Sequence, residues 1–367
     1  MPYNYCFYIH HHGAGHLMRA VAIANKMPEH QITFIGSDLM RHANAIPDYV
    51  DCIHLPMDTP TKQDSYAKSE SKSFLHYTPL NVHGLLERNG LMIDFFRRNP
   101  QTIIIVDVSS EVTLLARLCG IPSVVIRQHG NRTDPAHALA YESADLIIAP
   151  FSQEMDTPVN HPFWNKTLYA GGFSRYTDCK ATLDWEAKDI GILIGEGGSP
   201  INSSFVHHLR KELPKEVKLH VVGKVEPSTS SLDNQTHVFY HGRVDNPQEA
   251  LRTCSRVICN AGHNTIMELA DLRKKIICIP AERPFNEQTD KAFQLERLGC
   301  AVTVLEQHMY TVDWNACLNY ADCIDLDRLQ KLTSSNAISN IKKGLESLSE
   351  KHFVHSTDKV TSYEQYS

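Results

Sequence analysis

Apolar and polar residues follow one another along this chain in blocks that are typical of alternating strands and helices. Residues 3–9 are rich in aromatic and β-branched side chains and predict an inner strand. After a glycine turn, Leu17, Val21 and Ala24 recur at helical spacing and predict a helix. In this half of the chain we predict further strands at 32–35, 103–106, 121–126 and 145–149, and helices at 85–98 and 112–118.

The same alternation starts again after a polar stretch at 169–188. Strands that alternate with helices indicate parallel sheets with right-handed crossovers. We therefore predict an α/β fold of two doubly wound, Rossmann-like domains that face a central cleft. Their expected limits are residues 1–175 and 176–330, followed by a C-terminal helix and tail at 331–367. In the second half we predict strands at 190–194, 219–222, 237–240, 256–259 and 275–279.

Composition agrees with a globular protein of two domains. The chain has 367 residues, and a typical domain has about 150, so two domains are expected. Hydrophobic residues make up 42% and charged residues 21%, which excludes a largely disordered chain. The formal net charge is -6, from 36 Lys and Arg against 42 Asp and Glu, so a partner held through nucleic-acid phosphates is not expected.

Two further features of the sequence indicate a cytoplasmic protein. It contains neither an apolar stretch of about 18 residues nor a basic, cleavable leader. Its 10 cysteines are scattered without a CxxC pair, which is typical of free thiols in a reducing compartment.

A glycine loop separates the first predicted strand from the first helix. Gly13 and Gly15 allow a tight turn, and the helix start offers free N–H groups and positive potential to a ligand. The third glycine of a dinucleotide-binding motif would fall at Met18, which argues against NAD. His16 and Arg19 lie one turn apart on the same face of the helix. They are candidate cleft residues, and a plain glycine turn with solvent-facing polar side chains is the open alternative.

Four histidines, His10, His11, His12 and His16, raise the question of a metal site. Neighbouring residues of a strand point to opposite faces, so three consecutive histidines cannot all bind one ion. Since no acidic or cysteine spacing completes a coordination shell, we expect no metal.

Polar residues also follow two other strands of the first half. Asp107 can cap the next helix, as Ser109 or Ser110 can, or it can orient or deprotonate a group in the cleft; the pattern slightly favours capping. Gln128 and His129 follow the next strand and are expected to point at the same cleft, with a simple turn as the alternative. Ligands of open α/β sheets bind beyond the carboxyl ends of strands, where these residues lie.

Two polar segments of the second half have the same position relative to strands. Gly197, Gly198 and Ser199 form a loop that suits phosphate oxygens through its N–H groups, although a tight turn explains it equally well. Glu287 and Gln288 lie in a polar loop after the last predicted strand. Their side chains suit hydrogen bonds to sugar hydroxyls.

The most informative stretch begins at the glycine turn of Gly262. The helix that follows carries Asn264 and Thr265 in its first turn and Glu268 one turn further on. Its start can donate hydrogen bonds to a diphosphate, and Glu268 can accept two hydrogen bonds from a ribose diol. Thr265 and Glu268 also match a capping box, but this alternative leaves Gly262 and His263 unexplained.

Together these motifs resemble those of the GT-B glycosyltransferases, and more narrowly the MurG type and the UDP-glycosyltransferases. The resemblance covers roughly the first 300 residues. It comprises the glycine loop 13–16, the segment 127–130, the loop 197–199, the donor signature 261–268, Glu287 with Gln288, and the Leu-Glu-x-x-Gly at 295–299.

The resemblance implies a GT-B fold and an inverting, metal-independent hexosyltransferase. A nucleoside diphosphate sugar, expected to be a UDP-sugar, would be the co-substrate, and a small molecule, glycan or lipid would be the acceptor. His16 would be the catalytic base, with Asp107 as its orienter or substitute. The acceptor side of the cleft would comprise Gly13, Gly15, Arg19, Gln128 and His129. The donor would contact Gly197, Gly198, Ser199, Gly242, Arg243, Gly262, His263, Asn264, Thr265, Glu268, Glu287 and Gln288.

Two alternative functions stay open. The glycine loop also resembles a nucleotide-sugar hydrolase of the pseudaminic acid pathway, and a non-catalytic protein would bind the nucleotide sugar without turnover. A solvent-tight acceptor pocket would favour transfer, whereas a small polar pocket would favour hydrolysis. Residues 91–98 combine apolar residues with a basic pair, so they predict either a buried helix face or a peripheral membrane contact.

Overall fold

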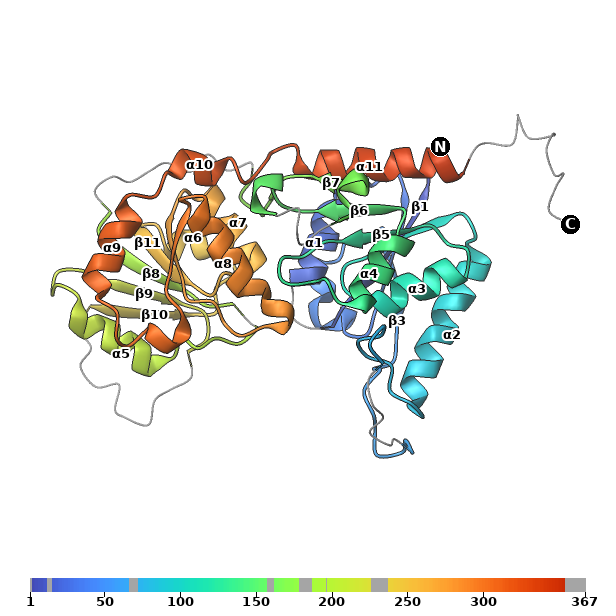
Figure 1. Cartoon of the computed structure of the whole chain (residues 1–367), viewed down its shortest axis with the longest axis horizontal. Helices are drawn as coiled ribbons and strands as arrows, with labels where there is room; N and C mark the ends of the chain where they lie inside the picture. The colour runs from blue at the N-terminus through green and yellow to red at the C-terminus, as the bar shows by residue number, and fades with distance from the viewer. Residues whose placement is uncertain are drawn as a thin grey trace, which may run out of the picture.

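The computed structural model describes residues 2–11, 15–65, 72–156, 162–177, 187–195, 197–225 and 237–353. Two parallel sheets with helices on their faces lie side by side in Figure 1, each belonging to one half of the chain. The predicted α/β class with two Rossmann-like units is confirmed. Gly13 and residues 66–71 of the predicted loop 59–73 lie outside the described residues.

The N-terminal domain is built on a seven-stranded sheet of order β3-β2-β1-β4-β5-β6-β7. Between β1 and β4 the strand order reverses, which makes this the topological switch point where such sheets bind ligands. The first helix follows β1 and the third follows β4, so their first residues meet at this point. The strands are β1 (Asn4–Ile9), β2 (Gln31–Gly36), β3 (Asp51–His54), β4 (Thr102–Val106), β5 (Ser123–Ile126), β6 (Leu146–Ala149) and β7 (Thr167–Tyr169). The helices are α1 (Gly15–Ala24), α2 (His83–Arg98), α3 (Ser110–Leu118) and α4 (Pro135–Ser143).

The C-terminal domain has a six-stranded sheet of order β10-β9-β8-β11-β12-β13, with its switch point between β8 and β11. The helix after β11 therefore starts at the cleft, like the helix after β1. The strands are β8 (Asp189–Leu193), β9 (Leu219–Val222), β10 (Val238–Gly242), β11 (Cys254–Cys259), β12 (Lys275–Cys278) and β13 (Ala301–Thr303). The helices are α5 (Ser203–Glu212), α6 (Pro247–Ala250), α7 (His263–Asp271), α8 (Glu287–Arg297), α9 (Trp314–Asp322), α10 (Leu326–Gln330) and α11 (Ala337–His352).

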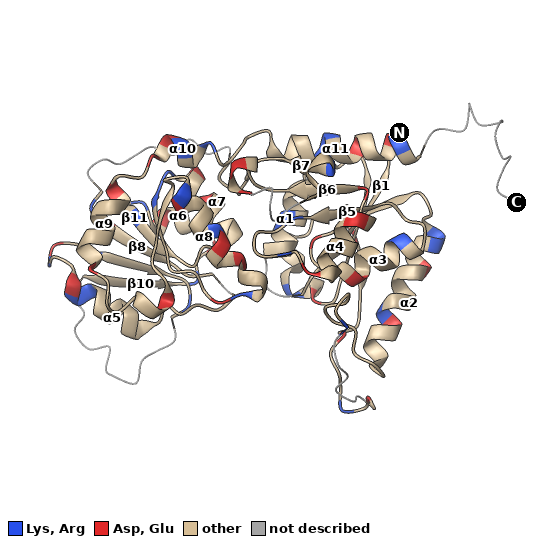
Figure 2. Ribbon diagram, viewed as in Figure 1, with Lys and Arg blue, Asp and Glu red and all other residues tan. Residues whose placement is uncertain are grey.

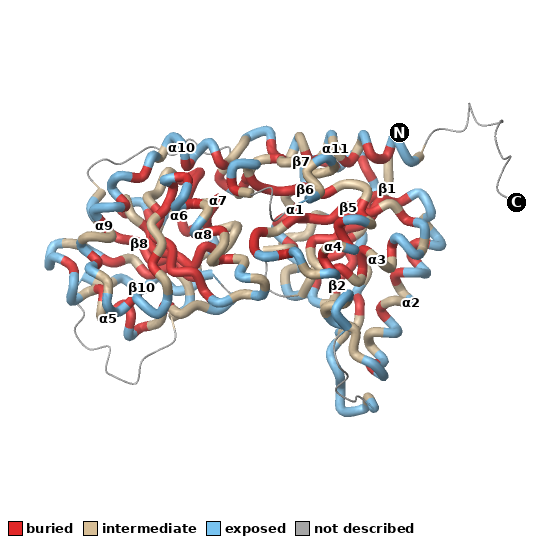
Figure 3. Tube along the Cα trace, in the orientation of Figure 1, coloured by how far each residue is buried: buried red, intermediate tan, exposed pale blue. Residues whose placement is uncertain are grey.

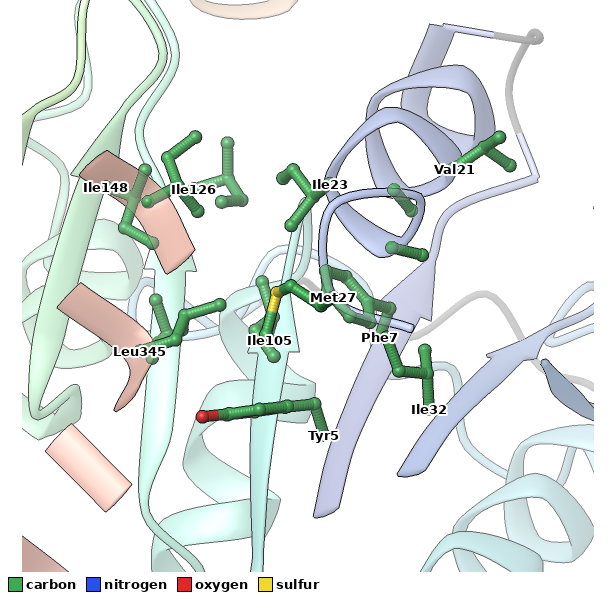
Figure 4. Packing of buried hydrophobic residues seen from close by; sticks show 14 of the residues in the cluster. Tyr5, Phe7, Val21, Ile23, Met27, Ile32, Ile105, Ile126, Ile148 and Leu345 are labelled. Carbon is green, nitrogen blue, oxygen red and sulfur yellow. The ribbon is translucent and has the colours of Figure 1, made fainter. Parts of the chain in front are cut away.

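Helix α11 crosses back to the N-terminal domain and completes its core (Figure 1). Its buried residues Ala337, Ile341, Leu345 and Leu348 pack in one hydrophobic cluster with residues of α1, β1 and β4. Figure 4 shows Leu345 in this cluster with Tyr5, Ile105 and Ile148.

Burial follows the strands, and charge is spread over the surface. Residues of the inner strands are buried in both domains (Figure 3). Acidic and basic residues are interspersed over both halves of the molecule (Figure 2). The buried-face interpretation of residues 91–98 is confirmed for Met92, Phe95 and Phe96, which lie in a core cluster. None of the helices in the described ranges combines the length and apolar character that a membrane span requires.

The sequence pattern missed some elements. Strand β3, three of whose four residues are exposed, lacks the apolar run that marks an inner strand. Strands β7 and β13 have three residues each, too few for a periodic signal. The limits of the two domains stay a prediction. The first sheet runs from Asn4 to Tyr169 along the chain and the second from Asp189 to Thr303, so each sheet lies within the limits predicted for its domain.

Candidate active site

A histidine, an aspartate and an arginine form the core of the site at the N-terminal switch point. Because β1 and β4 are neighbours, the residue after β4, Asp107, meets the first turn of α1. The Nδ1 atom of His16 lies 3.2 Å from Oδ2 of Asp107. Arg19 donates from Nη1 to both carboxylate oxygens of Asp107, at 2.6 and 2.7 Å. The carboxylate is therefore held between a buried cation and the imidazole.

This arrangement suits Asp107 for orienting the imidazole, and the role of His16 as the base stays a prediction. Burial alone would raise the pKa of Asp107, but the charges of Arg19 and His16 outweigh it, and the net pKa is lowered. The carboxylate favours a proton on Nδ1 of His16, which leaves the lone pair of Nε2 to accept one. The preference for Asp107 as a helix cap was wrong, because Ser109 caps α3 by accepting a hydrogen bond from the N–H of Val112 at 3.2 Å.

The starts of two helices face each other across the domains. A Cβ atom added to Gly15, the first residue of α1, would lie 3.4 Å from Nδ2 of Asn264 in the first turn of α7. Two helix starts that converge supply free N–H groups and positive potential from both sides, which suits a diphosphate. The capping-box interpretation was wrong, because Gly262 is the N-cap of α7 and Thr265 lies inside the helix.

Glu268 lies one turn into α7, with its side chain 14% exposed. Its Oε1 accepts a hydrogen bond from Nε of Arg175 at 2.9 Å. Burial raises the pKa of Glu268 and the charge of Arg175 lowers it, with a net rise. A ribose diol would therefore meet a carboxylate that already has one cationic partner, and this role stays a prediction.

Glu287 and Gln288 begin helix α8, and the polar loop predicted to contain them ends before it. The side chain of Gln288 is fixed, because its Oε1 accepts a hydrogen bond from the N–H of Ala281 at 2.9 Å. Its Nε2 lies 4.0 Å from the position of a Cβ added to Gly262, so the amide faces the start of α7. The carboxylate of Glu287 lies between two cations, with Oε1 3.3 Å from Nζ of Lys291 and Oε2 4.0 Å from Nη2 of Arg132.

The other predicted donor residues occupy exposed loops of the C-terminal domain. Arg283 donates from Nη2 to the carbonyl oxygens of Gly197 and Gly198, at 2.6 and 2.7 Å. Ser199 accepts from the N–H of Ile201 at 2.9 Å. Gly242 is the last residue of β10 and Arg243 follows it; β9 and β8 separate this strand from β11. These loops follow parallel strands and therefore lie at the same edge of the sheet as the start of α7. Their contact with the nucleotide stays a prediction.

Of the two polar residues predicted after β5, only one lines a cavity. Gln128 does so, and its Oε1 accepts from Nη2 of Arg132 at 2.7 Å. His129 is 3% exposed and its ring packs 4.0 Å from the ring of Phe151. Burial lowers the pKa of His129 well below its usual value, and the charges of Lys291 and nearby arginines lower it further. The expectation that His129 lines the open cleft was therefore wrong, because its ring is buried and neutral.

A cavity of about 60 Å³ begins at Asp107 and lies between the two domains. Phe285 of the C-terminal domain forms one wall, and its ring contacts those of His137 and His76 at 4.6 and 5.1 Å. The guanidinium of Arg132 lies 5.2 Å from the same ring. The lining residues are His76, Asp107, Val108, Ser109, Ser110, Thr113, Val125, Ile126, Gln128, Arg132, His137, Ala140, Tyr141 and Phe285.

Backbone contacts hold Phe285 against the N-terminal domain. The carbonyl of Phe285 accepts from the N–H of Asn131 at 2.7 Å, and the N–H of Gly130 donates to Asp290 at 2.9 Å. Gly130 has φ +101, and a Cβ there would lie 2.4 Å from the carbonyl oxygen of Phe285, so this close approach requires glycine. Phe285 and Asn286 have φ of 60 and 56, which is strained backbone of the kind that clusters at functional sites.

The cavity wall also contains a cluster with the composition of a metal site. The ligand atoms of His76, Asp134 and His137 lie within 4.8 Å of one another. Arg132 donates to Nε2 of His137 at 2.9 Å, so the proton of this imidazole is on Nδ1, which donates to Asp134 at 2.5 Å. Burial, followed by the charge of Arg132, lowers the pKa of His137 to about 4, so the ring is neutral. A cation on Nδ1 would need to displace this proton, so the contacts fit a hydrogen-bonded network better than a metal shell.

Several of these residues were not singled out from the sequence. Arg132 lies just beyond the segment 127–130, and Phe285 lies just before Glu287. Their proximity to predicted motifs was the available signal. Lys291 lies four residues after Glu287, but nothing in the sequence marked it as buried, and His76 carried no signal, because its position depends on contacts between segments far apart in the sequence.

Proteins of known name resemble this chain in sequence. Residues 195–313 match the glycosyltransferase family 28 C-terminal domain. The chain is 26% identical over 366 residues to the UDP-N-acetylglucosamine–N-acetylmuramyl-(pentapeptide) pyrophosphoryl-undecaprenol N-acetylglucosamine transferase of Alkaliphilus metalliredigens, covering 90% of this chain and 94% of that one. The enzyme of the same name from Haemophilus ducreyi is 22% identical over 339 residues, covering 87% of this chain and 89% of that one.

Solved structures share the fold over nearly the whole chain. MurG of Acinetobacter baumannii gives a TM-score of 0.63 at 14% identity and covers 94% of this chain and 100% of its own. Phytolacca americana UGT2, complexed with UDP-2-fluoro-glucose and pterostilbene, gives 0.64 at 12% identity and covers 96% of this chain and 99% of its own. The chain therefore has the GT-B fold of MurG and the UDP-glycosyltransferases, and its sequence is similar to that of enzymes named as N-acetylglucosamine transferases.

Proposed function

We propose that this enzyme transfers a hexosyl group from a UDP-sugar to an acceptor hydroxyl, with inversion at the anomeric carbon and without a metal ion. The observation that carries the proposal is the convergence of the helix starts of α1 and α7 beside the His16–Asp107 pair. The donor class is supported by relatives that are named as UDP-N-acetylglucosamine transferases. The acceptor is a small molecule, glycan or lipid.

The reaction follows from the positions of the charged groups. Nε2 of His16 accepts the proton of the acceptor hydroxyl while that oxygen attacks the anomeric carbon. The bond from this carbon to the diphosphate breaks, and its electron pair stays on the diphosphate oxygen. The imidazolium that forms lies beside the carboxylate of Asp107, which stabilises it. Attack from the face opposite the diphosphate inverts the anomeric configuration.

The starts of the two helices can stabilise the leaving group. Positive potential and free N–H groups of α1 and α7 are fixed before the reaction, so they stabilise the developing charge without reorganisation. This preorganised field supports metal independence. The proton positions in the His76–Asp134–His137 network also support it.

Glu268 provides a direct test of the donor site. In the wild type, UDP at 100 times its dissociation constant is expected to stabilise the fold by about 2.7 kcal/mol. Replacing Glu268 by alanine removes a charged hydrogen bond to ribose, worth about 1.5–3 kcal/mol. At the same UDP concentration, a 100-fold loss of affinity leaves only about 0.4 kcal/mol of stabilisation. Thermal melting with and without UDP measures this, and an unchanged response in Glu268→Ala contradicts the assignment.

The size of the cavity bears on the choice between transfer and hydrolysis. At about 60 Å³ it holds only a few water-sized groups, and its lining is partly polar, which supports a second candidate function as a nucleotide-sugar hydrolase. The relatives named as transferases support transfer. The two functions differ in whether an acceptor or water reaches Asp107 and His16.

Phe285→Ala distinguishes these functions. Removing the wall between the domains admits water to the site of a transferase, so we expect the ratio of UDP-sugar hydrolysis to transfer to rise about tenfold, or about 1.4 kcal/mol in relative barrier. A hydrolase would show no transfer to lose. Phe293 lies on α8, the helix that follows Phe285, and is 45% exposed, so Phe293→Ala is the matched control. Release of UDP and of free sugar, measured with a panel of hydroxyl acceptors, gives the ratio.

A further inference from the structure

We infer that Lys291 is a catalytic residue that binds the diphosphate of the donor and stabilises it as the sugar leaves. This inference rests on the proposed function, because it uses the same donor site. The diphosphate would then be bound by the ammonium of Lys291 as well as by the starts of α1 and α7.

Burial of an ammonium group requires an explanation. Lys291 is 0% exposed and lies on α8, one turn after Glu287. An ammonium has three N–H donors, and among the described residues the hydrogen bond recorded for Nζ is to Oε1 of Glu287 at 3.3 Å. Desolvating such a charge is costly unless several partners compensate it. An anionic ligand with several oxygens would supply those partners.

The carboxylate of Glu287, beside Lys291, also faces a second cation. Oε2 of Glu287 lies 4.0 Å from Nη2 of Arg132, so one carboxylate is shared by two cations. The nearby carboxylate of Asp107 is already bound to Arg19. Burial lowers the pKa of Lys291; Glu287 raises it, and the charges of Arg19 and Arg132 lower it again. Lys291 thus experiences two cations and one anion, an environment that an incoming anion would complete.

The charge of Lys291 acts at the start of α7. Burial lowers the pKa of His263, the first residue of that helix, and the charges of Lys291 and Arg19 lower it further. Lys291 also lowers the pKa of His129 from the other domain. The geometry of α8 agrees with this placement of the charge. Gln288, one turn before Lys291, has its Nε2 4.0 Å from the position of a Cβ added to Gly262, the N-cap of α7. Asp290, next to Lys291, accepts a hydrogen bond from the N–H of Gly130 in the N-terminal domain at 2.9 Å, so this part of α8 lies between the domains. A diphosphate where the two helix starts converge would accept hydrogen bonds from Nζ and from the helix N–H groups.

The chemical role follows from the charge that develops in the reaction. When the bond between the anomeric carbon and the diphosphate breaks, its electron pair remains on the β-phosphate oxygen. The ammonium stabilises this added negative charge and needs to transfer no proton. Its contribution is therefore larger in the transition state than in the bound donor, and removing it lowers kcat as well as affinity.

Lys291→Met tests the inference, since methionine keeps the length of the side chain and removes its charge. We expect the Kd of UDP to rise at least tenfold in calorimetric titrations of the full-length chain, and the Kd of uridine to change less than twofold. Lys291→Arg, which keeps the charge, should retain most of the affinity for UDP. Lys274→Met is the matched control, because Nζ of Lys274 binds the carbonyl of Cys254 at the opposite end of β11.

Each outcome separates the two claims. Equal UDP affinity in wild type and Lys291→Met overturns the role of Lys291 while leaving the donor site intact. A parallel loss of uridine and UDP binding, in a variant that melts like the wild type, also overturns it, because the effect would then not be specific to phosphate. If Lys291→Met does not fold, loss of UDP affinity in a folded Lys291→Gln keeps the test decisive. A wild type that binds neither UDP nor uridine contradicts the proposed function itself.

Discussion

Replacing His16 by alanine is expected to lower the turnover about 10²–10⁴-fold, the usual effect of removing a general base. The Kd of UDP should stay within about twofold of the wild type. The reason is geometric: His16 lies beside Asp107 at the start of α1, whereas the predicted ribose and sugar contacts lie on α7 and α8. Initial rates at saturating UDP-sugar, together with calorimetric titration of UDP, measure both quantities.

His83→Ala is a suitable control for this variant. The side chain of His83 is 80% exposed at the start of α2, so its loss should change neither rate nor affinity. Undiminished turnover in His16→Ala would show that another group accepts the proton. Loss of UDP binding in the same variant would instead show that His16 belongs to the diphosphate site.

Replacing Asp107 by alanine is expected to lower the free energy of unfolding by about 3–5 kcal/mol, because it leaves the buried guanidinium of Arg19 without its counter-charge. The double variant Arg19→Met, Asp107→Leu should recover most of this loss, since it removes both charges and fills their volume. Urea denaturation at pH 7 measures the three proteins. Equal destabilisation of single and double variants would contradict this explanation.

The same ion pair sets the sign of a pH effect. The pKa of Asp107 is lower in the folded chain than in the unfolded chain, where it is about 3.9. Its stabilising contribution is therefore fully present above about pH 3.9 and is lost as the pH falls through the lowered pKa. The wild type should lose more stability between pH 7 and pH 3 than the double variant does.

Much of the fold could be predicted from local patterns in the sequence. The continuous apolar run at β4 is buried at every position, as expected for an inner parallel strand. Helix α7 begins directly after Gly262, close behind strand β11, where the glycine in the sequence predicted a turn. Such features need no knowledge of distant contacts, so the sequence is enough to infer them.

The parts of the site that sequence reasoning missed depend on contacts across the domains. Phe285 closes a cavity whose other walls come from the N-terminal domain, and Lys291 is significant because it is buried beside Glu287, a carboxylate that also faces Arg132. Neither feature can be recognised from the spacing of residues in the sequence. The expected orientation of His129 failed for the same reason, because Phe151, which covers its ring, follows a different strand.

The return of α11 to the N-terminal domain affects how this enzyme can be recombined with its relatives. A chimera with a single junction near residue 175 would exchange α11 together with the C-terminal domain, and would replace the four side chains at 337, 341, 345 and 348 in the recipient's core. Losing their fit would destabilise the N-terminal domain before the specificity of the chimera could be assayed. Domain shuffling therefore requires two crossover points, one ahead of β8 and one between α10 and α11, so that the last helix stays with its own core.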